Sequence, residues 1–321
     1  MTTTTTKYPK GWFVVCFSDD VPVGGTKQLH YFGEELVAFR GEDGVVRVLD
    51  GYCAHMGANL GAGGKVCGNT IQCPFHAWKF SGTGECVEIP YAKKIPLKAR
   101  QRVWLTREVN GVVLVHHDAL GGAPDYDIPV IEDYGSVEWL PWTKNMYTIK
   151  THPREIIENI ADKGHFPMVH DTEIEDFTFE VDRHMAHQYV KGKALIRGGG
   201  VDNFASKTTY HGPGYLIMRM DGALKNYMLV AHTPRDEGSV DLRMGVMLKI
   251  VGNAEKTQGY VGQYMTNLKA GFEDDIRIWE NKLYRETPVL CDGDGPITQA
   301  RRWYRQFYVR ETPGAAQEQG Q

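Results

Sequence analysis

The sequence predicts an α+β protein with an all-β domain first and a larger α+β domain after it. Three observations support this fold class. Residues 11–118 read as short strands joined by glycine turns and show no convincing helical periodicity. Helical patterns appear only after residue 150, on either side of a group of strands. At 321 residues, the chain is also long enough for two ordinary domains.

The first region contains three hairpin signals, in which a glycine-containing turn separates two strand-like runs. The turns are Glu42-Asp43-Gly44, Gly82-Thr83-Gly84 and Asn110-Gly111, and the last is a strong two-residue hairpin signal. A stretch rich in Gly, Pro and Asp then begins at residue 118 and predicts a linker. We therefore expect domains at 1–118 and 130–309, joined by a linker at 119–129.

The second region begins with a predicted strand, WTKNMYTIK, at 142–150. A helical pattern follows at 153–166, with Pro153 well placed for a first turn. Strands are predicted within MRMDGALKNYMLVAH and VDLRMGVMLKIV, and a long helix at about 255–284. The tail at 310–321 has the composition of a disordered segment.

Composition limits the function. The formal net charge of −4 gives no support for a nucleic-acid partner. Six cysteines in so long a chain do not form a disulfide scaffold. The N-terminal stretch lacks the layout of a signal peptide, and no apolar run approaches the roughly 18–20 residues that span a bilayer. We expect a cytoplasmic protein without a transmembrane segment.

The main chemical signal is Cys53-x-His55 followed by Cys73-x-x-His76. Zinc fingers usually pair like ligands, whereas each half here mixes one cysteine with one histidine. This arrangement suits a [2Fe–2S] cluster of the Rieske type, with two thiolates on one iron and two imidazoles on the other. A structural zinc site, or buried cysteines beside a satisfied histidine, are the alternatives.

The two loops, CAHMGA and CPFHAW, resemble those of Rieske proteins. Respiratory Rieske proteins carry an extra cysteine in each loop, but Ala58 and Phe75 stand at those places here. The resemblance is therefore to the disulfide-free branch of oxygenases and ferredoxins. We interpret Cys67 and Cys86, which lie outside the loops, as buried thiols, although a pair remains an alternative.

A second metal site is predicted on the helix that follows the linker. Glu158, Asp162 and His165 are at i, i+4 and i+7, so they would share one helix face. His170 would point away in a regular helix, but Pro167 should break the helix and could bring it to the same side. Two imidazoles and a carboxylate with open positions suit non-haem Fe(II) that binds O2.

This segment also resembles the iron motif of Rieske oxygenases, N-x-x-D-x-x-H-x-x-x-x-H, with Asn159 and Asp162 before His165 and His170. The resemblance implies that both histidines bind mononuclear Fe(II). It also implies that Asp162 and Asn159 serve catalysis, with Asp162 linking the iron to the cluster of a neighbouring subunit in a homotrimer.

The third iron ligand should be a carboxylate on the late helix. Asp274 and Asp275 are adjacent and point about 100° apart on a helix, so one of them should reach the metal. We choose Asp275, because the Asp-Ile-Arg-Ile-Trp run that it begins resembles the family pattern. Asp274 remains the alternative.

Residues 275–308 and the cluster loops resemble the oxygenase component of bacterial 3-ketosteroid 9α-hydroxylases. The resemblance implies a Rieske monooxygenase with a helix-grip (START-like) catalytic domain and a hydrophobic polycyclic substrate, a 3-ketosteroid in the first instance. Electrons would come from a separate NADH-dependent flavin and iron–sulfur reductase, directly or through a ferredoxin. No G-x-G-x-x-G segment follows a strand here. Alternatives are a hydroxylase, desaturase or demethylase of another bulky substrate, and a Rieske electron carrier.

Overall fold

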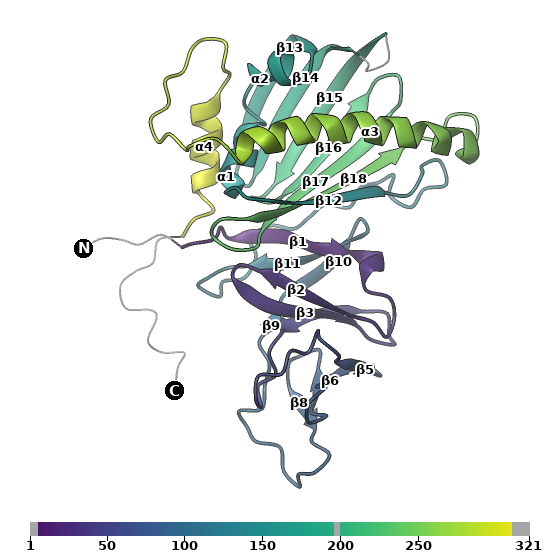
Figure 1. Ribbon diagram of the computed structural model, residues 1–321, viewed down its shortest axis with the longest axis vertical. Helices are drawn as coiled ribbons and strands as arrows, with labels where there is room; N and C mark the ends of the chain where they lie inside the picture. The colour runs from purple at the N-terminus through teal and green to yellow at the C-terminus, as the bar shows by residue number, and fades with distance from the viewer. Residues whose placement is uncertain (1–5, 196–199, 310–321) are drawn as a thin grey trace. The chain divides into compact units, whose positions relative to one another are not determined.

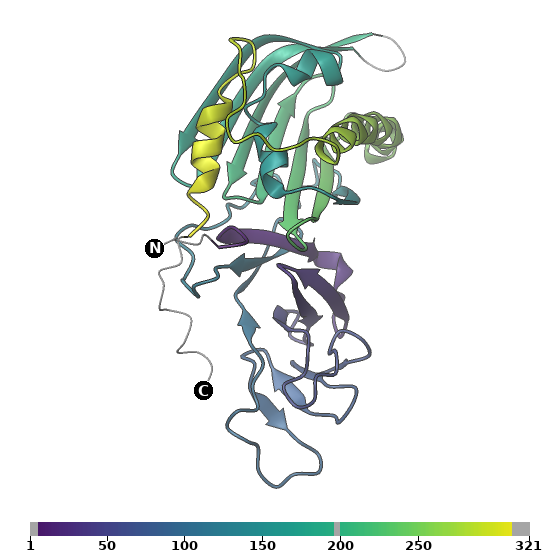
Figure 2. The same ribbon diagram turned by 60° about the vertical axis from the view of Figure 1, so that its left-hand side comes forward.

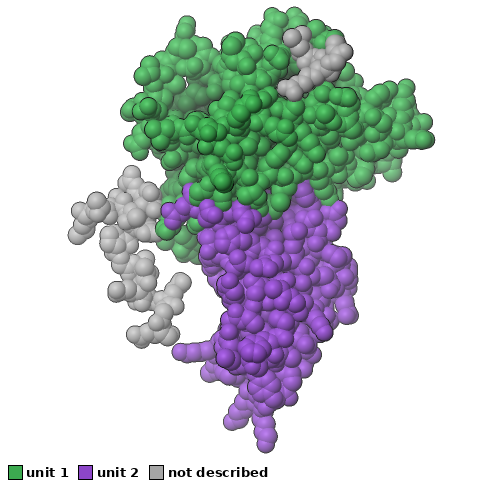
Figure 3. Space-filling view, viewed as in Figure 1, with its two compact units in different colours: residues 1–11, 118–234, 238–321 green, residues 12–117, 235–237 purple. Residues whose placement is uncertain are grey.

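The computed structural model describes residues 6–195 and 200–309, and the predicted disordered tail at 310–321 lies outside them. The chain divides into two compact units, which Figure 3 colours separately. The small-sheet unit comprises residues 12–117 and 235–237. The large-sheet unit comprises residues 1–11, 118–234 and 238–321.

The small-sheet unit is built from three small sheets and one short 3-10 helix, as the all-β prediction requires (Figure 1). The first sheet has the order β1 (Gly11–Phe17), β11 (Val112–His117), β10 (Thr106–Val109), and the 3-10 helix η1 is Ser18–Asp20. The second has the order β2 (Thr26–Tyr31), β3 (Glu34–Arg40), β4 (Val46–Asp50), β9 (Val103–Trp104). The third has the order β5 (Lys65–Cys67), β6 (Thr70–Gln72), β7 (Lys79–Ser81), β8 (Cys86–Glu88).

The three predicted hairpin turns are confirmed. They join β3 to β4, β7 to β8 and β10 to β11, and each pair is antiparallel. The last turn has φ of 54° at Asn110 and 76° at Gly111. Positive φ at both central residues is the geometry of the two-residue turn that Asn-Gly favours.

The large-sheet unit contains one seven-stranded antiparallel sheet of order β12-β18-β17-β16-β15-β14-β13, with α3 along one face (Figures 1 and 2). Its strands are β12 (Thr143–Ile149), β13 (Thr172–Asp182), β14 (Met185–Leu195), β15 (Val201–His211), β16 (Tyr215–Asp221), β17 (Asn226–Pro234) and β18 (Val240–Leu248). Its helices are α1 (Pro153–Glu158), α2 (His165–Val169), α3 (Ala254–Trp279) and α4 (Ile297–Arg305).

The core of this unit lies between the sheet and its helices. The strand register brings Val230 opposite Met244 and Met228 opposite Val246, so alternate residues of β17 and β18 face the same side. These four side chains join Met265 of α3 in one buried cluster. Burying each such side chain contributes about 1.5–3 kcal/mol, so this packing fixes α3 on the sheet.

Helix α3 ends five residues before the predicted end at 284. Two of its last carbonyl groups are taken by side-chain donors: Thr151 Oγ1 donates to the Trp279 carbonyl (3.2 Å), and Asn281 Nδ2 donates to the Arg277 carbonyl (2.8 Å). Side chains that occupy the terminal carbonyl groups stabilise a helix end. The Thr151 bond also attaches this end of α3 to the residues before α1.

Candidate metal centres

The four predicted cluster residues lie in two loops of the same construction. In the first loop, the Cys53 N–H donates to the Ala58 carbonyl (2.8 Å) and the Gly57 N–H donates to the Cys53 carbonyl (2.9 Å). The second loop repeats both bonds from Cys73, at 2.8 Å and 3.1 Å. The two loops therefore share one backbone hydrogen-bond pattern, and each carries one cysteine and one histidine.

The loops bring all four side chains to one place. Cys53 and Cys73 are buried, and the rings of His55 and His76 are 4.6 Å apart between centroids. Burial and the neighbouring Cys73 raise the pKa of the Cys53 thiol to about 11. His55 Nδ1 is buried and has no hydrogen-bond partner among the described residues. A buried polar atom without a partner is costly, and metal ligation would satisfy it. The donor set of two thiols and two imidazoles fits a Rieske cluster.

Trp78 is a residue of this site that sequence reasoning missed. Its indole ring stacks on His55 at 4.4 Å between centroids and 9° between planes. Its Nε1 donates to the Tyr91 hydroxyl (2.7 Å), whose ring lies 6.4 Å from that of His76. The only signal in the sequence was an aromatic residue two positions after His76.

Cys67 and Cys86 form no disulfide in the described part of the chain. Cys86 is buried, as interpreted, whereas Cys67 is only half-buried and its thiol faces the Gln72 side chain.

The predicted helix at 153–166 is wrong in one respect, because it is interrupted between α1 and α2. The Lys163 N–H donates to the Asp294 carbonyl (3.1 Å) instead of continuing the helix. Asp162 Oδ1 accepts the N–H of His165, the first residue of α2 (3.2 Å). The break therefore precedes Pro167, which lies in the first turn of α2, where no backbone donor is needed.

This break separates the three residues expected to share one face. Glu158 lies at the end of α1 and forms ion pairs with Arg301 (2.8 Å) and Lys282 (3.4 Å). His165 and His170 lie at the two ends of α2, with their rings 5.2 Å apart between centroids. The short helix, and not a long helix face, therefore sets the spacing of the two histidines.

The structure brings His165 and His170 together with Asp275 of α3. One possible ligand atom from each lies within 4.8 Å of the other two. His170 Nε2 is 3.4 Å from Asp275 Oδ2. Asp274 points elsewhere and pairs with Arg277 at 2.8 Å, so the geometry favours Asp275 over its neighbour.

Hydrogen bonding also prepares His165 for a metal. Its Nδ1 lies 2.6 Å from the Asp162 carbonyl oxygen, which can only accept. Nδ1 must therefore carry the proton, which leaves Nε2 with a lone pair for a ligand. Two imidazoles and one carboxylate, 8% exposed, fit a mononuclear iron of the two-histidine, one-carboxylate type.

Asp162 lies beside this group and remains partly open to solvent, with 36% of its side chain exposed. Burial opposes its ionisation, but hydrogen bonds with His165 prevail and lower the pKa of the Asp162 carboxyl. Burial likewise opposes a charge on His165, but Asp162 and Asp275 prevail and raise the pKa of this imidazole.

The Asn159 side chain is hydrogen-bonded to a residue of α3. Its Oδ1 accepts from Trp279 Nε1 (3.2 Å), so the segment with the histidines is tied to the helix with Asp275. Sequence reasoning used Trp279 only to recognise the family pattern, and nothing in the sequence marked its contact with Asn159.

Comparison with known families identifies both domains of the chain. Residues 11–103 match the Rieske [2Fe-2S] domain, and residues 115–308 match the 3-Ketosteroid 9alpha-hydroxylase C-terminal domain. The second match covers more than half of the chain. The chain belongs to the 3-ketosteroid 9α-hydroxylase family. It is thus a Rieske oxygenase, a class of enzyme that combines a Rieske cluster with a mononuclear iron.

Relatives of this 3-ketosteroid 9α-hydroxylase family member extend over nearly its whole length. The probable 3-ketosteroid-9-alpha-monooxygenase oxygenase component of Rhodococcus rhodochrous is 37% identical over 94% of this chain and 80% of its own. Cholesterol 7-desaturase of Caenorhabditis elegans is 32% identical over 95% of this chain and 78% of its own. The crystal structure of dicamba monooxygenase bound to dicamba has a TM-score of 0.78 at 16% identity and covers 95% of this chain and 98% of that one. This last likeness concerns the fold.

As an oxygenase component, the family member works with a separate reductase. Among the described residues, none of the helices combines the length and the apolar character needed to cross a bilayer.

Proposed function

We propose that this protein is the terminal oxygenase that hydroxylates a 3-ketosteroid at the 9α position. The observation that carries the proposal is the convergence of His165, His170 and Asp275 in a domain that matches the steroid hydroxylase family. The relatives named as 3-ketosteroid-9-alpha-monooxygenase components, at 33–37% identity, support the same substrate.

The residues divide into four roles in this proposal. Cys53 and Cys73 hold one iron of the cluster, and His55 and His76 hold the other. His165, His170 and Asp275 hold the mononuclear iron, which supplies the chemistry of O2 activation when bound. Asp162 orients His165 through its backbone carbonyl, and Asn159 fixes the segment against Trp279.

The face of the sheet that packs against α3 supports a hydrophobic substrate. Met218, Met228 and Met244 are neighbours across β16, β17 and β18 and belong to one apolar cluster. Methionines adapt their shape readily, so they can pack around a rigid polycyclic molecule. Asn226 Oδ1 and Thr208 Oγ1 lie on the same face, buried and without a partner among the described residues. Such atoms can orient a substrate by a hydrogen bond.

We further propose that electrons reach the iron from the cluster of a neighbouring copy in a homotrimer. Lys93, Lys94 and Lys98 follow Tyr91, which contacts the cluster histidine, and Leu97 between them is 98% exposed. A basic and apolar surface of this kind favours an acidic and apolar partner surface.

The large-sheet unit carries a surface of matching chemistry beside Asp162. The loop that bonds to Lys163 contains Glu286, Asp292 and Asp294, and no lysine or arginine occurs between residues 287 and 300. In the same loop Val289 is fully exposed, and on α2 Met168 is 80% exposed. Two copies of the chain could therefore pair a cluster with an iron through complementary surfaces.

A complementation experiment tests this route. Cys53→Ala removes a cluster ligand and Asp275→Ala removes an iron ligand, so neither variant should turn over substrate alone. Co-expressed with two different tags and purified as mixed oligomers, the two should regain part of the activity. If electrons pass only within one copy, the mixed oligomers will stay inactive, although each still contains both kinds of metal.

The substrate is tested by a product screen with a surrogate NADH-dependent reductase, with and without a ferredoxin. The panel contains 3-ketosteroids, sterols and bulky heterocycles, and mass spectrometry identifies the products. A 9α-hydroxylated 3-ketosteroid supports the proposal. The relationship to cholesterol 7-desaturase favours one second candidate, desaturation of a sterol, which would remove two hydrogen atoms and add no oxygen.

A further inference from the structure

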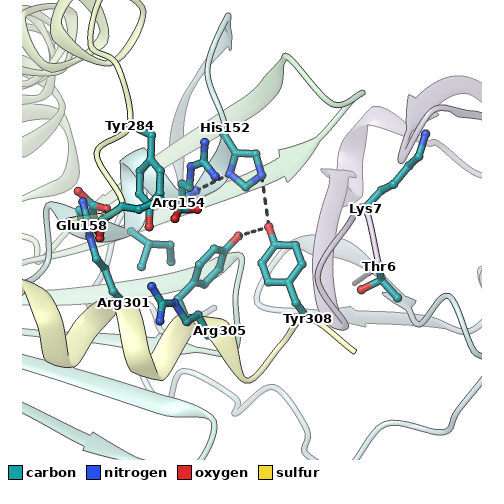
Figure 4. A pocket seen from close by; sticks show the side chains of 12 residues that line it. Thr6, Lys7, His152, Arg154, Glu158, Tyr284, Arg301, Arg305 and Tyr308 are labelled. Carbon is teal, nitrogen blue, oxygen red and sulfur yellow. Dashed lines mark hydrogen bonds and ion pairs between the residues drawn. The ribbon is translucent and has the colours of Figure 1, made fainter. Parts of the chain in front are cut away.

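The large-sheet unit contains a cavity of about 730 Å³ that the oxygenase chemistry does not use. It lies between the start of α1, the segment after α3 and the end of α4 (Figure 4). Its wall includes His152, Arg154, Glu158, Tyr284, Arg305 and Tyr308, and none of the expected iron ligands lines it. A volume of this size is typical of a pocket for a small molecule.

The hydrogen bonds of His152 leave the Tyr308 hydroxyl of this wall able to donate a hydrogen bond. His152 Nδ1 accepts the Arg154 N–H (3.2 Å), and burial lowers the pKa of this imidazole to about 4. The neutral ring therefore carries its proton on Nε2, which faces the Tyr308 hydroxyl at 3.4 Å. The Tyr308 oxygen accepts from this side, so its own proton is available to Tyr304 at 3.4 Å or to a molecule in the cavity.

The buried acceptors of the wall are already occupied. Glu158 pairs with Arg301 and Lys282, and Arg301 Nη1 also donates to the Arg285 carbonyl (2.6 Å). Arg154 uses Nε for Glu155, and its guanidinium lies 3.8 Å above the ring of Tyr284. The terminal nitrogens of Arg154 remain as donors.

Arg305 adds a guanidinium one helical turn beyond Arg301. The Arg305 guanidinium has no hydrogen-bond or ion-pair partner in the described part of the chain. A cation in the last turn of a helix also favours the helix dipole. The helix dipole explains a cation at the end of α4. It does not explain why Arg154 of α1 and the Tyr308 hydroxyl line the same cavity. The one lining carboxylate without such a partner, Glu286, is exposed to solvent.

We propose that this cavity is a second binding site, separate from the iron, for a small molecule with a carboxylate or phosphate group. The oxyanion would accept from Arg305, from the terminal nitrogens of Arg154 and from the Tyr308 hydroxyl. Charge-assisted bonds of this kind are the strong ones in proteins. Since α1 leads directly to Asn159 and Asp162, a bound anion would also stabilise the segment that holds His165.

Calorimetric titration of the metal-loaded protein tests the site with two probes, inorganic phosphate and succinate, at an ionic strength held constant with sodium chloride. At least one probe should bind saturably, with one site per chain. Arg305→Gln should weaken that binding about tenfold, because a hydrogen bond to a charged group is lost. Arg302→Gln removes the same charge from an exposed neighbour that does not line the cavity, and should leave binding unchanged.

Tyr308→Phe provides an independent variant, because it removes only one hydroxyl and should weaken binding several-fold. Saturable binding of one probe alone would support the site and identify the class of its anion. Absence of saturable binding with both probes would overturn the proposal. Equal weakening by Arg302→Gln and Arg305→Gln would overturn it as well, because it would indicate general attraction to a basic helix. Hydroxylation can succeed or fail in the product screen without changing either result.

Discussion

The two metal centres differ in the distance along the chain over which they are assembled. All four cluster residues lie between Cys53 and His76, in two loops with the same hydrogen bonds. The iron group joins His165 and His170 on a short helix to Asp275, which is 105 positions further along. The cluster site is formed by two loops that are close in the sequence, whereas the iron site depends on how α3 packs beside α2.

This difference has a physical consequence for each site. Backbone hydrogen bonds within each loop hold its cysteine and histidine, so we expect changes elsewhere in the fold to have little effect on the spacing of ligands within a loop. The iron group depends on contacts that join α3 to the residues around α1, including Trp279 to Asn159 and Thr151 to the end of α3. Loss of such a contact shifts Asp275 relative to the histidines.

The largest effect should follow from removing a cluster ligand. Cys53→Ala leaves three protein ligands, so we expect loss of the [2Fe–2S] cluster, its visible absorption and all turnover. The matched control is Cys86→Ala, which removes a buried thiol of the same unit outside the ligand loops. A colourless Cys86→Ala protein, or a coloured Cys53→Ala protein, would contradict the assignment.

Asp275→Ala should remove the mononuclear iron and reduce turnover by more than about a hundredfold, because even residues that only support a metal ligand cost 10–100-fold. The cluster absorption should remain. Asp274→Ala loses the ion pair with the exposed Arg277 side chain and should keep its iron and most of its activity. Iron content per chain, measured beside the visible spectrum, decides between the two carboxylates. Loss of iron from the Asp274 variant alone would reverse the assignment.

The separation of the ligands along the chain also decides how much of each site could be predicted from the sequence. The cluster residues and the three hairpins could be predicted from neighbouring residues alone. The structure confirms the hairpins and brings the rings of His55 and His76 together. The shared face of Glu158, Asp162 and His165 was wrong, because Asp294, over 100 positions away, takes the Lys163 N–H and the helix stops. Spacing could not reveal that contact.

The ion pairs of Glu158 were hidden for a similar reason. Its partner Arg301 lies on α4, 143 positions later, and nothing near Glu158 in the sequence distinguishes a metal ligand from a structural carboxylate. The choice of Asp275 over Asp274 came from a family resemblance, and only the packing of α3 gives it a geometric reason.

Asp162→Ala should reduce turnover by about 10–100-fold and leave both metals bound, because the carboxylate accepts the His165 backbone N–H and, in the function proposed above, belongs to the electron route. The alanine variant also loses the acceptor of the His165 N–H, which costs about 1 kcal/mol. Asp162→Asn keeps an oxygen for this hydrogen bond and removes only the charge. If the charge serves electron transfer, the asparagine variant will be as slow as the alanine variant while recovering its stability. Normal turnover in both would refute the role of Asp162.

The smallest effect should come from Trp279→Phe, which removes one donor and leaves Asn159 Oδ1 without its partner. We expect a loss of about 1 kcal/mol in the free energy of unfolding. A similar loss at the iron group corresponds to a roughly fivefold decrease in turnover. Trp303→Phe is the matched control, because Trp303 is also buried and donates one bond, to the Arg183 carbonyl (3.1 Å), away from the iron. Both variants should lose similar stability, measured by denaturant unfolding, but only Trp279→Phe should slow turnover. If Trp279→Phe and Trp303→Phe slow turnover equally, the contact between Asn159 and Trp279 acts on stability alone. The geometry of the iron group would then not depend on this contact.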